Sequence, residues 1–127
     1  MAYGVNRTQG EIEARFTEAM IKFERDFMGR GPSEVKSYIL DDMVLVRFRG
    51  IITRAEHHLA DADATGRGRD LIKQSRMELM EKSRPLLNEL VRKELGRTIV
   101  SLHTDLSVKS GERIVVFVLD KKVLSPA

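Results

Sequence analysis

The sequence predicts an α+β fold, in which a four-stranded sheet, mixed or antiparallel, forms one layer and helices cover one of its faces. Three observations lead to this prediction. Apolar residues recur at helical spacing in two long segments, short segments between them alternate apolar and polar residues, and these short segments come in two pairs. The expected order along the chain is helix, two strands, two helices, two strands.

The first helix is expected from about Thr8 to Met28. Thr8 and Glu11 fit a capping box, in which each side chain accepts a hydrogen bond from the backbone N–H of the other residue. An apolar stripe follows, with charged residues such as Glu24 on its flanks. The stripe is expected to face the core and contains Ile12, Phe16, Ala19, Met20, Phe23 and Phe27. The GRGP sequence at 29–32 ends this helix.

Period-two alternation predicts four strands, at 34–40, 43–52, 97–107 and 113–120. Asp41 and Asp42 form the expected tip of the first hairpin. The KSG sequence forms the expected tip of the second, with Gly111 in the left-handed conformation. Each pair of strands is therefore expected to be antiparallel.

Two helices are expected between the hairpins. Thr53 fits the cap of a short helix, with Glu56 three residues further on. A long helix is expected from about Arg69 to Leu95, with a kink at Pro85 because the apolar spacing continues on both sides of the proline.

Alternation also assigns strand residues to the two faces of the sheet. In the third strand, Val100 and Leu102 are assigned to the core, and His103 and Asp105 to the opposite face. That opposite face is expected to carry apolar residues beside polar ones, namely Leu45, Ile99, Val115, Phe117 and Leu119 beside Arg47, Arg49, His103 and Asp105. A monomer rarely leaves such a patch bare, so we expect a second copy, a partner or the segment 55–62 to cover it.

Composition limits the classes of function. The 127 residues fit one domain, expected at 8–120 with flexible tails at 1–7 and 121–127. The chain has no cysteine, which excludes disulfides and thiol catalysis. No apolar run approaches the ~20 residues of a membrane span, and no signal peptide is evident, so a cytoplasmic location is expected.

A net charge of +3 is small, and basic residues are spread among acidic ones. Because the sequence also lacks aromatic platforms, nucleic acid is not expected as a partner. The expected partner is a second copy of the chain, as a homodimer or a higher homo-oligomer.

The pair formed by His103 and Asp105 raises the question of a reactive site. Hydrolysis would need a serine in a nucleophile turn, or a cysteine, and neither is present, so no catalytic residue is assigned and no enzyme is expected. Metal binding could add His57 or His58, but adjacent helical residues point about 100° apart. No metal and no cofactor are therefore assigned.

A polar network in an interface or a ligand pocket remains for this face. The candidate ligand or interface residues are Arg47, Arg49, His103, Asp105 and Phe117. Arg67 and Arg69 stand near the start of the long helix and are candidates for binding an anion, because helix N-termini attract negative charge.

Three segments together resemble the bacterial MpsC family: GRGPSEVKSYILDDMVLVRFRGIIT at 29–53, GRDLIKQSRMELMEKSRPLLNELV at 68–91 and SLHTDLSVKSGERIVVFVLD at 101–120. The resemblance extends from about Thr8 to Asp120. The matching positions are Gly29, Arg30, Gly31, Pro32, Asp41, Asp42, Arg84, Pro85, His103, Thr104, Asp105 and Gly111. The family offers no catalytic motif to transfer to this chain.

The family name refers to a sodium-translocating system that generates membrane potential. The resemblance implies a soluble accessory or regulatory role in cation transport, with a membrane transport protein as a further partner. Attachment to the membrane would then occur through that partner. The alternative is an oligomeric sensor of a small ligand or anion, with no direct role in transport.

Overall fold

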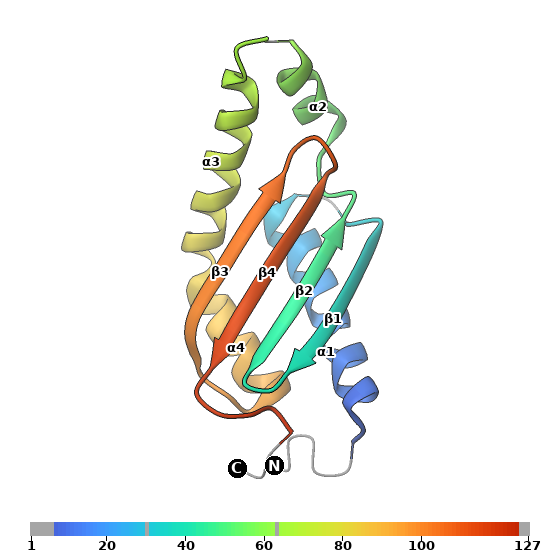
Figure 1. The fold of residues 1–127 in the computed structure, drawn as a ribbon, viewed down its shortest axis with the longest axis vertical. Helices are drawn as coiled ribbons and strands as arrows, with labels where there is room; N and C mark the ends of the chain where they lie inside the picture. Colours follow the sequence, from blue (N-terminus) through green and yellow to red (C-terminus); the bar gives the residue numbers. More distant parts are fainter. Residues whose placement is uncertain (1–6, 30, 63, 125–127) are drawn as a thin grey trace.

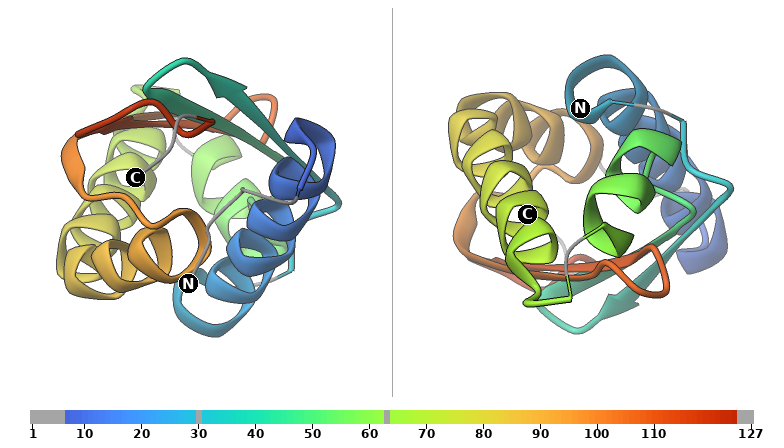
Figure 2. Two further views of the ribbon diagram at one scale, coloured as in Figure 1. Left: turned by 90° about the horizontal axis from the view of Figure 1, so that it is seen from below. Right: turned by 90° about the horizontal axis from the view of Figure 1, so that it is seen from above.

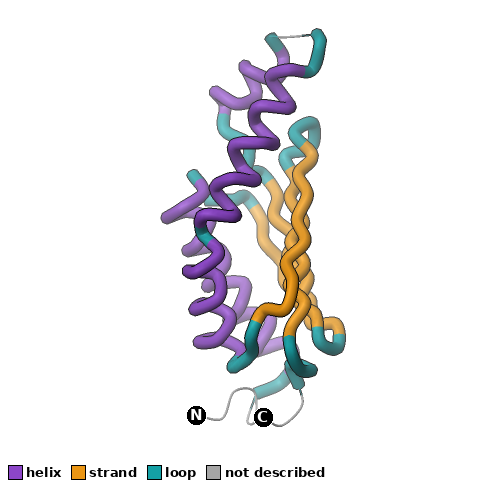
Figure 3. The backbone as a smooth tube through the Cα atoms, turned by 90° about the vertical axis from the view of Figure 1, so that its left-hand side faces the viewer, coloured by secondary structure: helices purple, strands orange, loops and turns teal. Residues whose placement is uncertain are grey.

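The structure, a computed structural model, describes residues 7–29, 31–62 and 64–124. Its backbone forms two layers, a sheet and a set of helices that all lie on one side of it (Figures 1 and 3). This arrangement confirms the predicted α+β class. Of the tails expected at 1–7 and 121–127, residues 1–6 and 125–127 lie outside the described residues, and so does the matching position Arg30.

The elements follow the predicted order, with one additional helix. They are α1 (Gln9–Phe23), the π-helical segment η1 (Glu24–Met28), β1 (Glu34–Leu40), β2 (Met43–Arg49), α2 (Arg54–Asp61), α3 (Arg67–Lys82), α4 (Arg84–Leu95), β3 (Ile99–Ser107) and β4 (Glu112–Leu119).

The sheet has the strand order β1-β2-β4-β3, and every neighbouring pair is antiparallel. The second strand of each hairpin is therefore central, and β1 and β3 form the edges. Asp41 turns the first hairpin with a φ of 62°, and Gly111 turns the second with a φ of 72°. The left-handed conformation predicted for Gly111 is confirmed, although four residues (108–111) separate the strands.

The core lies between the sheet and the helices. Phe16 from α1 meets Phe117 from β4 edge-to-face, with ring centroids 5.7 Å apart. Phe48 from β2 is also fully buried. Beyond β4, Val123 packs into the same core, and its N–H donates to the Asp41 carbonyl oxygen.

The end of the first helix differs from the prediction. The capping box of Thr8 and Glu11 is confirmed, but the last turn is π-helical. A π turn contains more residues than an α turn, so it rotates the following side chains around the helix axis. Phe27 is consequently 50% exposed, whereas Glu24 and Met28 are buried. The core position predicted for Phe27 and the flank position predicted for Glu24 were wrong.

The predicted long helix is interrupted at Ser83, close to the expected kink. Pro85 lies in the first turn of α4, where its missing N–H costs nothing. Upstream, the Ser83 backbone N–H and hydroxyl both donate to the Leu79 carbonyl oxygen. The proline therefore separates α3 from α4. Both helices keep buried residues on the side that faces the core.

Two strand assignments were also wrong. Phe117 and its neighbours Val115 and Leu119 are almost fully buried in the core, and β4 turns its even-numbered residues outward. Because β4 is apolar at consecutive positions, alternation could not distinguish its faces, and an error of one residue reverses them all. A register irregularity between Ile99 and Ser101 turns Ile99 toward the core and leaves Val100 63% exposed.

Helix α2 begins with the predicted capping box of Thr53 and Glu56. It packs against α3 in the helical layer, so this segment does not cover the opposite face of the sheet (Figure 2). A glycine, Gly68, allows the close approach: a Cβ atom there would overlap the carbonyl oxygen of Leu59.

Replacing Gly68 by alanine should destabilise the protein by about 1–3 kcal/mol, because the backbone of α2 must move away. Gly10→Ala is the matched control, since Gly10 is also helical but nothing lies within 4 Å of a Cβ there. That control should be neutral or stabilising by up to about 1 kcal/mol. Urea unfolding of both variants measures the difference, and equal stabilities would contradict the packing.

Candidate functional site

The sheet face opposite the helices carries no other element within the described part of the chain (Figure 2). Residues paired across antiparallel strands point to the same face, so the register defines three rows across the sheet. The rows are Leu40, Met43, Val118 and Ser101; Tyr38, Leu45, Val116 and His103; and Lys36, Arg47, Ile114 and Asp105. We call these residues the open face.

The centre of the open face is apolar. Leu45 and Val116 stand at its middle and are only half-buried. Toward the edge strand β1, Tyr38 and Leu40 are 41% and 48% exposed. This side of the sheet is therefore apolar at its centre, but of the five apolar residues predicted for it only Leu45 lies there, and β4 supplies its even-numbered residues instead of Val115, Phe117 and Leu119.

Charged residues occupy one end of the open face and the strand positions just beyond it. Arg47 Nε lies 2.6 Å from Glu112 Oε2, and Arg49 contacts Glu34 at 3.5 Å and Glu112 at 3.9 Å. These pairs run along and across β1, β2 and β4. They are partly exposed, so their contribution to stability is small.

The two residues that posed the question of a reactive site lie on the edge strand β3. The His103 ring is hydrogen-bonded to the Ser101 hydroxyl at 3.2 Å. Asp105 accepts from the Leu106 N–H and pairs with Lys73 of α3 at 3.2 Å, and both contacts lower the pKa of Asp105. His103 and Asp105 thus have separate partners, and neither contacts Arg47.

The other predicted candidates lie elsewhere. Phe117 is in the core, so it cannot contribute to an interface. Arg67 and Arg69 occupy the exposed first turn of α3, away from the sheet. Across the described residues, no group of three or more His, Asp or Glu side chains could hold a metal ion.

Sequence reasoning missed a buried charge network. Glu24 has no exposed surface, and Arg76 of α3 is 4% exposed. Arg76 Nη1 lies 3.4 Å from Glu24 and donates to the Met28 carbonyl oxygen, while Nη2 donates to the Ile51 carbonyl oxygen. The same guanidinium binds Glu56 with two hydrogen bonds, of 2.6 and 3.1 Å. Arg76 thereby joins η1, α2 and the segment after β2.

The capping glutamate Glu56 is part of the same network. Burial alone would raise its pKa, but hydrogen bonds from Arg76 and from the Thr53 cap hold the pKa of Glu56 below its ordinary value. Glu56 therefore remains ionised at neutral pH and balances the charge of Arg76.

Arg113 of β4 completes the network and is 2% exposed. Its Nη2 pairs with the second oxygen of Glu24, and its guanidinium lies 4.7 Å from the centroid of the Phe48 ring. Burial lowers the pKa of Arg113 to about 10, so the group is still protonated at neutral pH.

Only one sequence signal pointed to this network. Arg113 directly precedes the apolar run of β4, two residues before Val115, which places it on the same face of the strand. That face could be identified as the core only from the pairing with β2. Glu24 gave no signal, because a regular helix would leave it on the flank.

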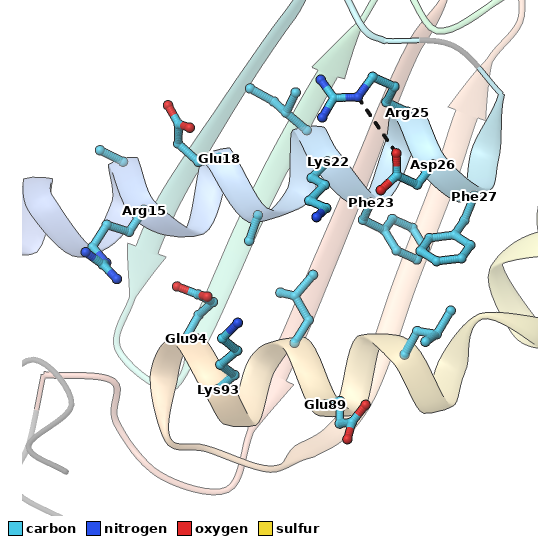
Figure 4. A pocket seen from close by; sticks show the side chains of 15 residues that line it. Arg15, Glu18, Lys22, Phe23, Arg25, Asp26, Phe27, Glu89, Lys93 and Glu94 are labelled. Atoms are coloured by element: carbon cyan, nitrogen blue, oxygen red, sulfur yellow. Dashed lines mark ion pairs between the residues drawn. The ribbon is translucent and has the colours of Figure 1, made fainter.

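A broad groove separates α1 and η1 from α4 on the outer side of the helical layer (Figure 4). Its volume is about 1090 Å³. The exposed Phe27 lies beside Phe23 at one end, with a centroid distance of 5.7 Å, and the pair Arg25–Asp26 borders them. Four acidic and four basic residues line it, so the groove has no net preference for the charge of an occupant.

Removing the buried carboxylate should be strongly destabilising. Glu24→Gln leaves two buried guanidinium groups without their shared counter-charge, and a loss of about 3–5 kcal/mol is expected in urea unfolding. Glu18→Gln on the exposed side of α1 is the control, expected within about 0.5 kcal/mol of the wild type.

The two buried residues should also be coupled. Arg113→Met should cost less in the Glu24→Gln background than in the wild type, because the pair is already broken. Independent, additive losses would contradict a direct interaction between Glu24 and Arg113.

The comparisons with known proteins agree with the resemblance that was expected from the sequence. Residues 8–121 match the model of a family described as "Na+-translocating membrane potential-generating system (MpsC)". The chain is 37% identical to the uncharacterized protein YbcI of Bacillus subtilis (strain 168) over 115 residues, which are 91% of this chain and 90% of YbcI. It is 23% identical to the uncharacterized protein YrhF of the same strain over 112 residues, which are 85% of this chain and 87% of YrhF.

No solved structure matches the chain. Among the described helices, none combines the length and the apolar character needed to cross a membrane. The family match spans almost the whole of the described chain, including both hairpins and every helix. The chain therefore belongs to the MpsC family.

Proposed function

We propose that this protein is a non-catalytic accessory component of a cation-translocating system, and that it acts as a homodimer joined through the open face. The observation that carries the proposal is the uncovered apolar centre of this face, around Leu45 and Val116. Exposed apolar patches bordered by polar residues are typical of protein–protein interfaces. The family description supplies the connection to cation translocation.

The arrangement of the rows favours a second copy as the occupant. A two-fold axis parallel to the strands places each row over the same row of the second copy and exchanges the edge strands β1 and β3. The apolar centres then meet, and Lys36 on one edge faces Asp105 of the second copy on the other. Such a contact is isologous, so each pairing occurs twice.

The resulting dimer would be a sandwich of two sheets, with the helical layers outside. Aligned sheets pack about 10 Å apart through side chains of their inner faces. Half-buried Leu45 and Val116 have the size and position to fill that space. The row that contains Lys36, Arg47 and Asp105 would remain at the rim of the interface. There Arg47 keeps its partner Glu112.

The polar residues of the open face support a non-catalytic role. Arg47 is engaged by Glu112, Asp105 by Lys73 and His103 by Ser101. These are separate surface pairs, and none of them aligns a nucleophile, a base and an orienting group as covalent catalysis requires.

The dimer can be tested by placing a charge at its centre. The wild type is expected to sediment at about twice the chain mass of 14.5 kDa, whereas Val116→Glu should be monomeric because the carboxylate would be buried without a partner. Leu71→Glu is the control, since Leu71 is a 46% exposed apolar residue on α3. A monomeric wild type at tens of micromolar, or a dimeric Val116→Glu, would refute the interface.

The accessory role needs a separate test. Tagged wild-type protein, captured from gently solubilised cells of the native host, should recover a subunit of a membrane cation transporter above the level of a tag-only control. Recovery should be weaker with Val116→Glu, because a dimer presents each docking surface twice. Absence of any membrane transport protein from the wild-type capture would contradict the accessory role whatever the oligomeric state.

A further inference from the structure

The groove between α1 with η1 and α4 belongs to the helical layer, so the proposed dimer leaves it uncovered. We call it the outer groove. On the α1 side its lining extends from Ala14 to Phe27. Because a helix rises about 1.5 Å per residue, this wall is about 20 Å long, which is the length of a helix of about four turns.

Apolar side chains in the outer groove remain exposed. Phe27 at its end is 50% exposed, and Leu86 of α4 is 40% exposed. Leu90 lies one helical turn beyond Leu86 and is only partly buried against the core. On the α1 wall, Ala14 and Ala19 have small side chains that allow a second backbone to approach. Exposed apolar residues that are bordered by polar ones are typical of interaction sites.

The exposure of Phe27 results from the π-helical turn. In a regular helix this ring would face the core, but η1 turns it outward beside Phe23, with a centroid distance of 5.7 Å. Single π turns are rare in proteins, and those that occur are frequently at functional sites. Aromatic residues are also enriched among the residues that dominate the energetics of protein interfaces. The turn therefore provides an exposed aromatic anchor at the end of the groove.

The two walls of the outer groove differ in the sign of their charge, although the groove as a whole is neutral. On α1 and η1, three basic residues outnumber two acidic ones, whereas on α4 two acidic residues outnumber Lys93. Lys22 from α1 and Glu94 from α4 point into the space between the two helices (Figure 4). A complementary occupant therefore carries acidic residues toward α1 and basic residues toward α4.

A helix from another protein meets these requirements. Its side chains at positions i and i+4 form one apolar stripe, and the two flanks of the stripe can carry charges of opposite sign. A small molecule would span only part of a groove of this length. A second copy of the chain does not fit either, because the open face and the outer groove lie on opposite sides of the molecule. Two-fold contacts on both sides would build an open chain of molecules instead of a closed oligomer.

We propose that the outer groove binds one amphipathic helix of a partner protein, about four turns long, in the helix-in-groove mode. The apolar stripe of that helix covers Phe27, Leu86 and Leu90. Its acidic flank faces α1 and η1, and its basic flank faces α4. This inference rests on the proposed function only for the identity of the partner, a subunit of a cation transporter. The proposed dimer presents two such grooves on its outer sides.

Photo-cross-linking tests the site in the full chain. Phe27→p-benzoylphenylalanine, produced in cells of the native host, should form a covalent link to a second protein on illumination. Mass spectrometry should place the linked residue in a segment with apolar residues at helical spacing, acidic residues on one flank and basic residues on the other. The same probe at Leu71, which is 46% exposed on α3 outside the groove, is the matched control and should not link to this segment.

A synthetic peptide of the linked segment then measures the contact by fluorescence anisotropy. Phe27→Glu should weaken binding at least about tenfold, because it places a carboxylate in the apolar contact. Lys22→Glu should also weaken binding, and a peptide whose acidic flank is changed to lysine should bind this variant better than it binds the wild type. Leu71→Glu should bind the peptide as the wild type does.

The outcomes separate this site from the proposed function. Cross-linking at position 27 no stronger than at position 71, a link only to a second copy of the chain, or a linked segment without the amphipathic pattern would overturn the proposal. A linked helix from a protein without a role in cation transport would support the groove and contradict the accessory role. Capture of a transporter subunit by the wild type, without a cross-link from position 27, would support the accessory role and overturn the groove.

Discussion

One buried carboxylate, Glu24, connects the parts of this protein that the sheet alone would not hold together. It faces Arg76 from α3 and Arg113 from β4, and Arg76 extends the network to Glu56 in α2. Three helical elements and a central strand therefore share one set of charges. Hydrophobic contacts are non-directional, whereas hydrogen bonds between charged groups require particular geometry, so the network selects one orientation of α3 over the sheet.

The π-helical turn η1 makes this network possible. A regular continuation of α1 would bury Phe27 and leave Glu24 toward solvent. The wider turn reverses these positions, and Phe27 instead joins Phe23 at the end of the outer groove. A π turn is frequent at functional positions in proteins, and here it exchanges an aromatic core contact for an ionic one. The same turn thus accounts for both a buried charge and an exposed ring.

The two layers leave the molecule with two different surfaces. The helices bury one side of the sheet, and they expose a charged and mostly polar outer side. The opposite side of the sheet keeps a half-buried centre around Leu45 and Val116, because none of the described helices crosses to it. The proposed dimer would cover that centre.

The sequence by itself determined the class of the fold, the two hairpins and both capping boxes, because each depends on local spacing or on the backbone preferences of a few residues. It also located a helix irregularity near Pro85, although it predicted one kinked helix where the structure has two. The sequence also placed Arg47, His103 and Asp105 on the outer face, because alternation is regular in β2 and in β3 beyond the irregularity at Ile99 to Ser101. Only the tertiary structure decided which face of β4 is buried, since consecutive apolar residues such as Val115 and Val116 fit either one. Only the tertiary structure likewise paired Glu24 with Arg76 and Arg113, because residues that are distant in sequence meet only when the layers pack.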